Sequence, residues 1–134
     1  MIDGLIERVR GLTGPDRFVD LDIAIATGVL PAEVAKYGPH LRRIEARRVD
    51  PYTASLDAAV ALVERALPDH PWHVFRDDPL ANAMGFSTGG YVGQILGGPG
   101  HAWKIAHCEG PNPGIALILA LLSALKAKEA QDGR

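Results

Sequence analysis

The stretch DPYTASLDAAVALVERALPDHPWHVFRDD, residues 50–78, holds the clearest succession of structural signals in the chain. Thr53 or Ser55 can cap a helix, and Pro68 ends it. One apolar stripe along that helix is formed by Leu56, Ala59, Val60, Val63 and Leu67. The segment Trp72–Arg76 then predicts a strand. A capped helix followed by a strand indicates a globular domain that contains both helices and strands.

Shorter helical patterns precede this stretch. Apolar residues recur at helical spacing over 2–12, which predicts an amphipathic helix. A second helix is predicted over 16–28 with Asp16 near its N-cap, although its apolar residues also alternate as in a strand. A short helical turn is predicted over 31–38. The segment HLRRIEARRV, residues 40–49, is compatible with either a helical turn or an extended arm.

Strands dominate the second half of the chain until a last helix. Two further strands are predicted over 90–96 and 101–108, and the Gly-rich turn between them favours an antiparallel meander. Strict alternation would place Lys104 and Ala106 on one face of the third strand. A long helix is predicted over 113–130. The elements predict an α+β fold, a three-layer α/β/α sandwich with a small antiparallel sheet covered by helices.

Composition narrows the class of protein. The 134 residues are 47% hydrophobic and 22% charged, with a net charge of −2, which predicts one globular domain over residues 1–134. This charge gives no electrostatic reason to expect nucleic acid or an anionic membrane as a partner. The single cysteine, Cys108, excludes an intramolecular disulfide and is compatible with a reducing cytoplasm. A secretion signal begins with basic residues followed by an apolar run, whereas this N-terminus carries the acidic Asp3 and Glu7. We therefore expect no secretion signal.

The longest apolar run, IALILALLSAL over residues 115–125, is shorter than the roughly 20 residues that span a bilayer. We therefore expect a buried helix and no membrane partner. The run is apolar on nearly every side of a helix, which is more than one face of a thin sheet would cover. Part of it is therefore expected to pack against another copy of the chain in a homo-oligomer.

Four arginines form the one concentration of charge in the chain. Planar guanidinium groups suit phosphates and carboxylates, although such a run is also typical of a solvated surface. If the ligand is a nucleotide, the nearby Tyr52 can stack on its base. Ser87 and Thr88 can offer hydroxyls and backbone N–H groups to an anion. The candidate ligand-binding residues are Arg42, Arg43, Arg47, Arg48, Tyr52, Ser87 and Thr88.

The sequence carries no recognisable catalytic or metal-binding signature. A site built from His73, His107 and Cys108 across paired strands is conceivable, but solvent-facing histidines are far commoner. The Gly-rich segment 85–100 lacks the Lys-Ser/Thr ending of a phosphate loop. Two acidic pairs are interpreted as a helix surface and a turn, namely Asp20 with Asp22 and Asp77 with Asp78. We therefore expect no enzymatic activity, no metal and no cofactor.

Three motifs together resemble a family of small phage and prophage proteins named for a phage "ABA sandwich" domain. These motifs are TGPDRFVDLDIAIATG at 13–28, YTASLDAAVALVERALP at 52–68 and PNPGIALILALLSALKAKEA at 111–130, with a Trp-bearing strand between the last two. A Thr-Pro pair is expected to open the last helix in that family, whereas this chain has Asn112-Pro113. The Arg-rich segment 40–48 is not part of the shared pattern.

The resemblance implies a helix-sheet-helix sandwich of viral origin and carries no catalytic residues with it. We therefore expect a phage-encoded, non-catalytic binding protein in the host cytoplasm. A counter-defence role fits this class, either by sequestering an anionic nucleotide signal or by occupying a host defence protein. The alternatives are a phage structural or assembly accessory protein and, last, an unrecognised hydrolase.

Overall fold

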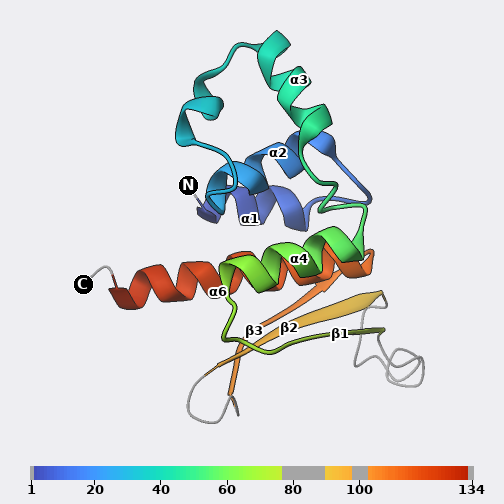
Figure 1. The fold of residues 1–134 in the computed structure, drawn as a ribbon. Helices are drawn as coiled ribbons and strands as arrows, with labels where there is room; N and C mark the ends of the chain where they lie inside the picture. The colour runs from blue at the N-terminus through green and yellow to red at the C-terminus, as the bar shows by residue number, and fades with distance from the viewer. Residues whose placement is uncertain (1, 77–89, 98–102, 133–134) are drawn as a thin grey trace.

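The computed structural model describes residues 2–76, 90–97 and 103–132 (Figure 1). Its helices and strands follow the order α1 (Ile2–Arg10), α2 (Arg17–Ala26), η1 (Ala32–Lys36), α3 (Pro39–Arg48), α4 (Leu56–Ala66), β1 (Trp72–Arg76), β2 (Tyr91–Gly97), β3 (Trp103–Gly110) and α6 (Pro113–Asp132). Of the two conformations compatible with residues 40–49, the structure has the helix. Residues 77–89 and 98–102, which include the predicted turn between β2 and β3, lie outside the described residues.

The described elements stack in three layers (Figure 1). The antiparallel sheet, in the order β1-β2-β3, forms one outer layer. Helices α4 and α6 form the middle layer, with α6 against all three strands, and α1, α2 and α3 lie beyond them. The predicted α+β fold, with a small antiparallel sheet covered by helices, is confirmed. The prediction placed the sheet in the middle, whereas the described helices all lie on one of its faces.

Two glycines let α6 approach the sheet closely. A Cβ on Gly93 of β2 would overlap the carbonyl oxygen of Ala116 on α6. A Cβ on Gly110, at the end of β3, would lie 2.7 Å from the backbone nitrogen of the same residue. Neither overlap could be relieved by turning a side chain, because both involve backbone atoms of α6. The inner face of the sheet is therefore shaped for direct backbone contact with this helix.

The predicted alternation along the third strand is wrong at one point. The pairing of β2 with β3 shifts between Ile95, which lies opposite Ala106, and Leu96, which lies opposite Lys104. Ile95 and Leu96 are consecutive on β2, whereas their partners on β3 are two residues apart, so the regular pairing is interrupted here. The intervening Ile105 is the extra residue of a β-bulge. Nothing in the local sequence distinguishes this strand from a regular one.

Helix α6 is the centre of the core. Its residues 115–122, together with Ala124, are at most 2% exposed. The sheet covers one side of the helix, and α4 and α1 cover others. The apolar surface that led us to predict a homo-oligomer is therefore buried within a single chain, and oligomerisation stays a prediction. None of the described helices is long and apolar enough to cross a membrane.

Three predicted helix caps are confirmed. The side chain of Asp16 accepts hydrogen bonds from the backbone N–H groups of the first turn of α2. Ser55, one of two candidates for α4, accepts from Ala58 N at 3.2 Å. Asn112 accepts from Ile115 N at 2.8 Å at the start of α6. Each cap satisfies backbone donors that a helix leaves unpaired at its N-terminus, which is why these signals can be read locally.

The assignment of Asp20 to a helix surface is wrong, because its side chain is fully buried. Its Oδ1 accepts hydrogen bonds from the backbone N–H of Thr53 at 2.8 Å and from the Thr53 hydroxyl at 2.7 Å. Its Oδ2 accepts from Arg17 at 3.1 Å. The Thr53 carbonyl accepts from the side chain of Asn112 at 3.0 Å. The backbone N–H of Asp16 donates to the Thr53 hydroxyl at 2.9 Å. We call Asp16, Asp20, Thr53 and Asn112 the Thr53 joint, because they tie the N-termini of α2, α4 and α6 together.

Candidate functional site

A cavity of about 480 Å³ opens where the first four helical segments meet. This volume lies in the range of about 300–1,000 Å³ that is typical of small-molecule pockets. Residues far apart in the sequence form its wall, since α1, α2, η1 and α3 all contribute. The lining residues are Gly4, Leu5, Arg8, Asp22, Ile25, Ala26, Ala35 and Arg42. We call this cavity the Asp22 pocket.

Two guanidinium groups meet one carboxylate in the Asp22 pocket. Arg42 Nη2 on α3 donates to Asp22 Oδ1 at 3.0 Å, and Arg8 Nη1 on α1 donates to Asp22 Oδ2. The Asp22 and Arg42 side chains are 18% and 24% exposed, and that of Arg8 is 52% exposed. The local charge is therefore positive by one unit. Each guanidinium uses only one nitrogen on Asp22, so N–H donors remain on both for a ligand.

Apolar side chains complete the wall of the Asp22 pocket. Leu5 is 5% exposed, and Ile25 and Ala26 of α2 are half-buried. Positive charge beside an apolar wall suits a small anion that also carries an apolar part, because each half then meets a matching surface. The ion pairs through Asp22 hold the guanidinium groups in place before a ligand arrives, which lowers the entropic cost of ordering them.

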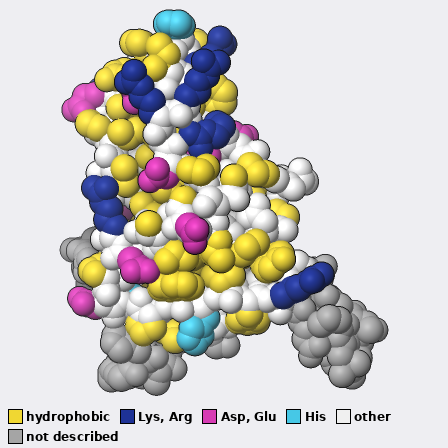
Figure 2. Space-filling view, turned by 45° about the vertical axis from the view of Figure 1, so that its right-hand side comes forward, with side chains coloured by type: hydrophobic (Ala, Val, Ile, Leu, Met, Phe, Trp, Pro, Cys, Tyr) yellow, Lys and Arg dark blue, Asp and Glu magenta, His cyan; other side chains and the backbone are white. Residues whose placement is uncertain are grey.

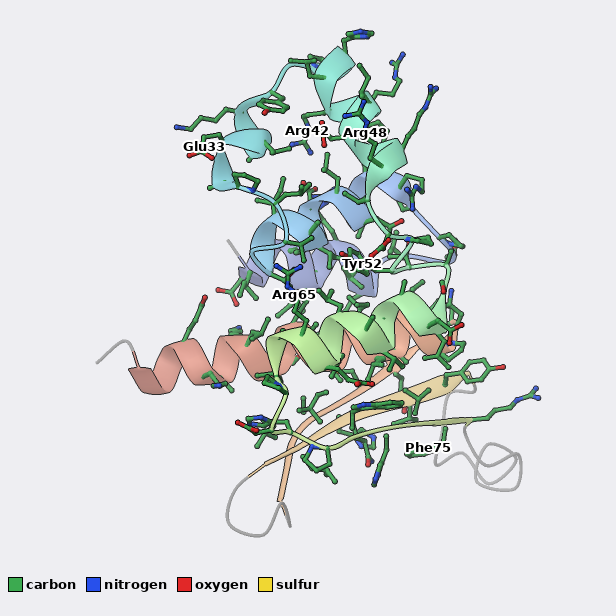
Figure 3. All side chains as sticks on the ribbon, in the orientation of Figure 1. Glu33, Arg42, Arg48, Tyr52, Arg65 and Phe75 are labelled. Carbon is green, nitrogen blue, oxygen red and sulfur yellow. The ribbon has the colours of Figure 1, made fainter. Side chains whose placement is uncertain are left out.

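The structure separates the four predicted arginines. Arg42 points from α3 toward η1 and α2, whereas Arg48 lies on the outer side of α3 (Figure 3). Arg43 and Arg47 are also exposed. Basic side chains accordingly gather over the α3 end of the molecule in the space-filling view (Figure 2). Of these four arginines, Arg42 alone lines the Asp22 pocket, and Arg48 pairs loosely with Glu45 at 3.8 Å.

The structure does not bring Tyr52 to the arginines. Its side chain is 2% exposed and belongs to the main hydrophobic core, between the outer helices and α4 (Figure 3). Burial raises the pKa of its hydroxyl above the ordinary value. A ring in this position offers no free face on which a base could stack. The other two predicted ligand residues, Ser87 and Thr88, lie outside the described residues.

Two residues of the Asp22 pocket were missed in the sequence. Arg8 sits in an ordinary amphipathic helix, and Asp22 was assigned to a helix surface without a partner. Arg8 and Asp22 are 14 residues apart and lie on different helices, so no short-range sequence pattern could have predicted their contact. A useful signal would have been the excess of four arginines over one acid, Glu45, within α3, because the remaining arginines need partners from other elements.

The histidines and the cysteine considered for a metal do not converge. His73 of β1 and His107 of β3 both lie opposite Gln94 of β2, which separates them, and Gln94 Nε2 lies 2.8 Å from His107 Nδ1. Cys108 lies on the other face of the sheet, with its Sγ 3.5 Å from Ser123 Oγ on α6. Within residues 2–76, 90–97 and 103–132, no group of three or more His, Cys, Asp or Glu side chains is placed to hold a metal ion.

Comparison with known proteins does not assign the chain to a family. No protein-family model matches the chain, and neither the curated proteins nor the solved structures contain a significant match. The residues of the Asp22 pocket are therefore the basis for assigning a function.

Proposed function

We propose that this protein is a non-catalytic binding protein that holds a small anion in the Asp22 pocket. The observation that carries the proposal is the pairing of Arg8 and Arg42, from two different helices, on either side of a single carboxylate. These partly exposed ion pairs contribute little to stability, and in this proposal their role is to hold two guanidinium groups at the cavity, ready for an anion. The apolar wall selects an anion with an apolar portion over a bare inorganic ion.

The chemical class of the ligand is a phosphate-bearing small molecule such as a nucleotide. Guanidinium groups donate two parallel hydrogen bonds to phosphate oxygens, which gives both affinity and orientation. Together with the resemblance to small phage proteins, this chemistry supports a role in the infected cytoplasm, where the protein sequesters an anionic nucleotide signal of the host. Such a role needs binding and no turnover.

Isothermal titration calorimetry against linear and cyclic nucleotides, with inorganic phosphate as the minimal probe, tests the proposal. We expect at least one nucleotide to bind, and Arg8→Ala and Arg42→Ala each to weaken its affinity about tenfold, because each removes a charge-assisted hydrogen bond. Higher salt should weaken binding.

Arg43→Ala is the matched control, because it removes the same charge one residue along α3 from an exposed position outside the cavity. Arg43→Ala should leave the affinity nearly unchanged. If Arg47→Ala and Arg48→Ala abolish binding while Arg8→Ala and Arg42→Ala do not, the outer side of α3 is the site and the Asp22 pocket is not. If no anion produces heat, anion sequestration is rejected.

A further inference from the structure

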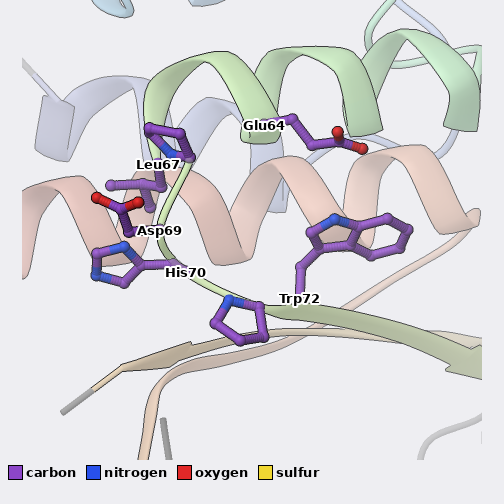
Figure 4. A pocket seen from close by; sticks show the side chains of 7 residues that line it. Glu64, Leu67, Asp69, His70 and Trp72 are labelled. Atoms are coloured by element: carbon purple, nitrogen blue, oxygen red, sulfur yellow. The ribbon is translucent and has the colours of Figure 1, made fainter. Parts of the chain in front are cut away.

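A second cavity lies on the other side of α4, where this helix ends and the chain enters the sheet. Its volume is about 620 Å³, and its wall is formed by Glu64 near the end of α4 and by the six consecutive residues 67–72. The lining residues are Glu64, Leu67, Pro68, Asp69, His70, Pro71 and Trp72 (Figure 4). We call it the Trp72 pocket. It shares no residue with the Asp22 pocket, so an inference about it does not depend on the proposed function.

The Trp72 pocket has the opposite charge to the Asp22 pocket. Glu64 and Asp69 are exposed carboxylates, and the lining contains no lysine or arginine. Within the described part of the chain neither carboxylate forms an ion pair or a side-chain hydrogen bond. Two negative charges around one hollow attract a cation. Figure 4 shows Glu64 at one end of the pocket, on the side of the Trp72 indole, and Asp69 at the other.

The wall between the two carboxylates is apolar and firmly held. Trp72 packs partly into the main core, which fixes its indole, and Leu67 is 2% exposed. Pro68 and Pro71 restrict the backbone between α4 and β1, and the backbone N–H of His70 donates to Leu67 O at 3.1 Å. A tryptophan ring is the best aromatic partner for an organic cation. A ligand thus meets a preformed surface.

His70 adds a polar group to this wall. Its Nδ1 is buried and is the one side-chain nitrogen or oxygen that is both buried and unpaired in the described residues. A buried polar atom without a partner costs free energy, and such atoms often mark places that a ligand or an ordered water completes. When Nδ1 is the unprotonated, accepting nitrogen of the ring, a cation that carries N–H donors matches it, whereas a quaternary ammonium does not.

We propose that the Trp72 pocket binds a linear aliphatic diamine. One ammonium group pairs with Glu64 and lies near the face of Trp72, the other pairs with Asp69, and the methylene chain between them covers Leu67 and the indole. A divalent metal ion fits this arrangement poorly, because it needs oxygen ligands gathered around one point. Carboxylates at opposite ends of an apolar wall instead match a ligand that carries two charges at opposite ends of an apolar chain.

Fluorescence titration of the Trp103→Phe variant tests the proposal, since Trp72 is then the one remaining tryptophan. The probes are 1,4-diaminobutane, 1,5-diaminopentane, butylamine and tetramethylammonium. We expect the diamines to change the Trp72 emission with a Kd on the order of 1 mM, because both carboxylates are exposed to water. Butylamine should bind at least about threefold more weakly, because it engages one carboxylate only.

Glu64→Gln and Asp69→Asn preserve shape while removing charge, and each should weaken diamine binding about two- to fivefold. Asp57→Asn, on the first turn of α4 and outside the cavity, is the matched control and should have no effect. Circular dichroism verifies that all three variants are folded. Equal affinity for butylamine and the diamines overturns the proposal, as does an equal loss of affinity in Asp57→Asn and Glu64→Gln. A response to lysine-containing peptides without any response to free diamines also overturns it.

Discussion

Asp20 and Asp22 are two residues apart on the same helix, yet they belong to two regions with different purposes. The Thr53 joint buries Asp20 completely and satisfies it with Thr53 and Arg17. The Asp22 pocket leaves its carboxylate partly accessible between two arginines. Residues two apart on a helix point about 160° away from each other, so α2 presents one acid to the core and the other to the cavity. A charge can therefore hold the fold or shape a binding site, depending on the side of the helix that carries it.

The largest expected effect is on the free energy of unfolding, which should fall more for a substitution in the Thr53 joint than for one in the Asp22 pocket. Asp20→Ala should lower the free energy of unfolding by about 3 kcal/mol, because it leaves the Thr53 N–H, the Thr53 hydroxyl and Arg17 without their buried acceptor. Asp22→Ala should cost at most about 1 kcal/mol, because its ion pairs are partly exposed. Urea denaturation of both variants measures the difference. Equal losses of unfolding free energy would show that the Thr53 joint contributes no more to stability than the Asp22 pocket does.

The next effect concerns pH and is confined to the joint. Burial raises the pKa of Asp20 above its ordinary value, and the hydrogen bonds from Thr53 and the ion pair with Arg17 only partly oppose it. The folded protein therefore holds this proton more tightly than the unfolded chain does. The associated stabilisation is complete below the unfolded pKa of about 3.9 and is lost as the pH rises through the folded pKa.

Asp20→Asn removes this titration. The stability of the unmodified protein relative to Asp20→Asn should therefore fall as the pH rises above about 4, by about 1.4 kcal/mol for each pH unit by which the folded pKa is raised. Denaturant midpoints of both proteins between about pH 4 and 7 measure this difference. A relative stability that rises over this interval would mean that the hydrogen bonds outweigh burial and that the pKa of Asp20 is lowered instead.

The same contrast explains what could be predicted from the sequence. The caps at Asp16, Ser55 and Asn112 were recognisable because each acts on backbone groups within its own first helical turn. The roles of Asp20 and Asp22 were not, because they depend on which distant segments pack against each side of α2. Helix periodicity identifies that two faces exist, but only the packing of the other helices decides which face is buried.

The bulge in β3 and the Asp22 pocket illustrate the same limit. The bulge depends on how two strands align across a turn, and the pocket depends on four helical segments meeting at one place. The Arg-rich run was a sound indication of a basic surface, yet only Arg42 among its members turns toward a cavity. A cluster of charged residues in a sequence therefore predicts a charged surface more reliably than it predicts a binding site.

The smallest expected effect is on the affinity of the Asp22 pocket for its ligand. Asp22→Asn keeps the shape of the side chain and removes the one negative charge of the pocket, so both guanidinium groups are left more available to an anion. Stability should change by at most about 0.5 kcal/mol, since the replaced ion pairs are near the surface. The affinity for the nucleotide identified by calorimetry should rise about two- to fivefold, and its salt dependence should steepen because the local charge increases from +1 to +2. Glu45→Gln is the control, because it removes a carboxylate that pairs with Arg48 and lies outside the cavity. If Asp22→Asn weakens binding instead, the carboxylate is needed to orient Arg8 and Arg42, and its role as a positioning group outweighs its charge.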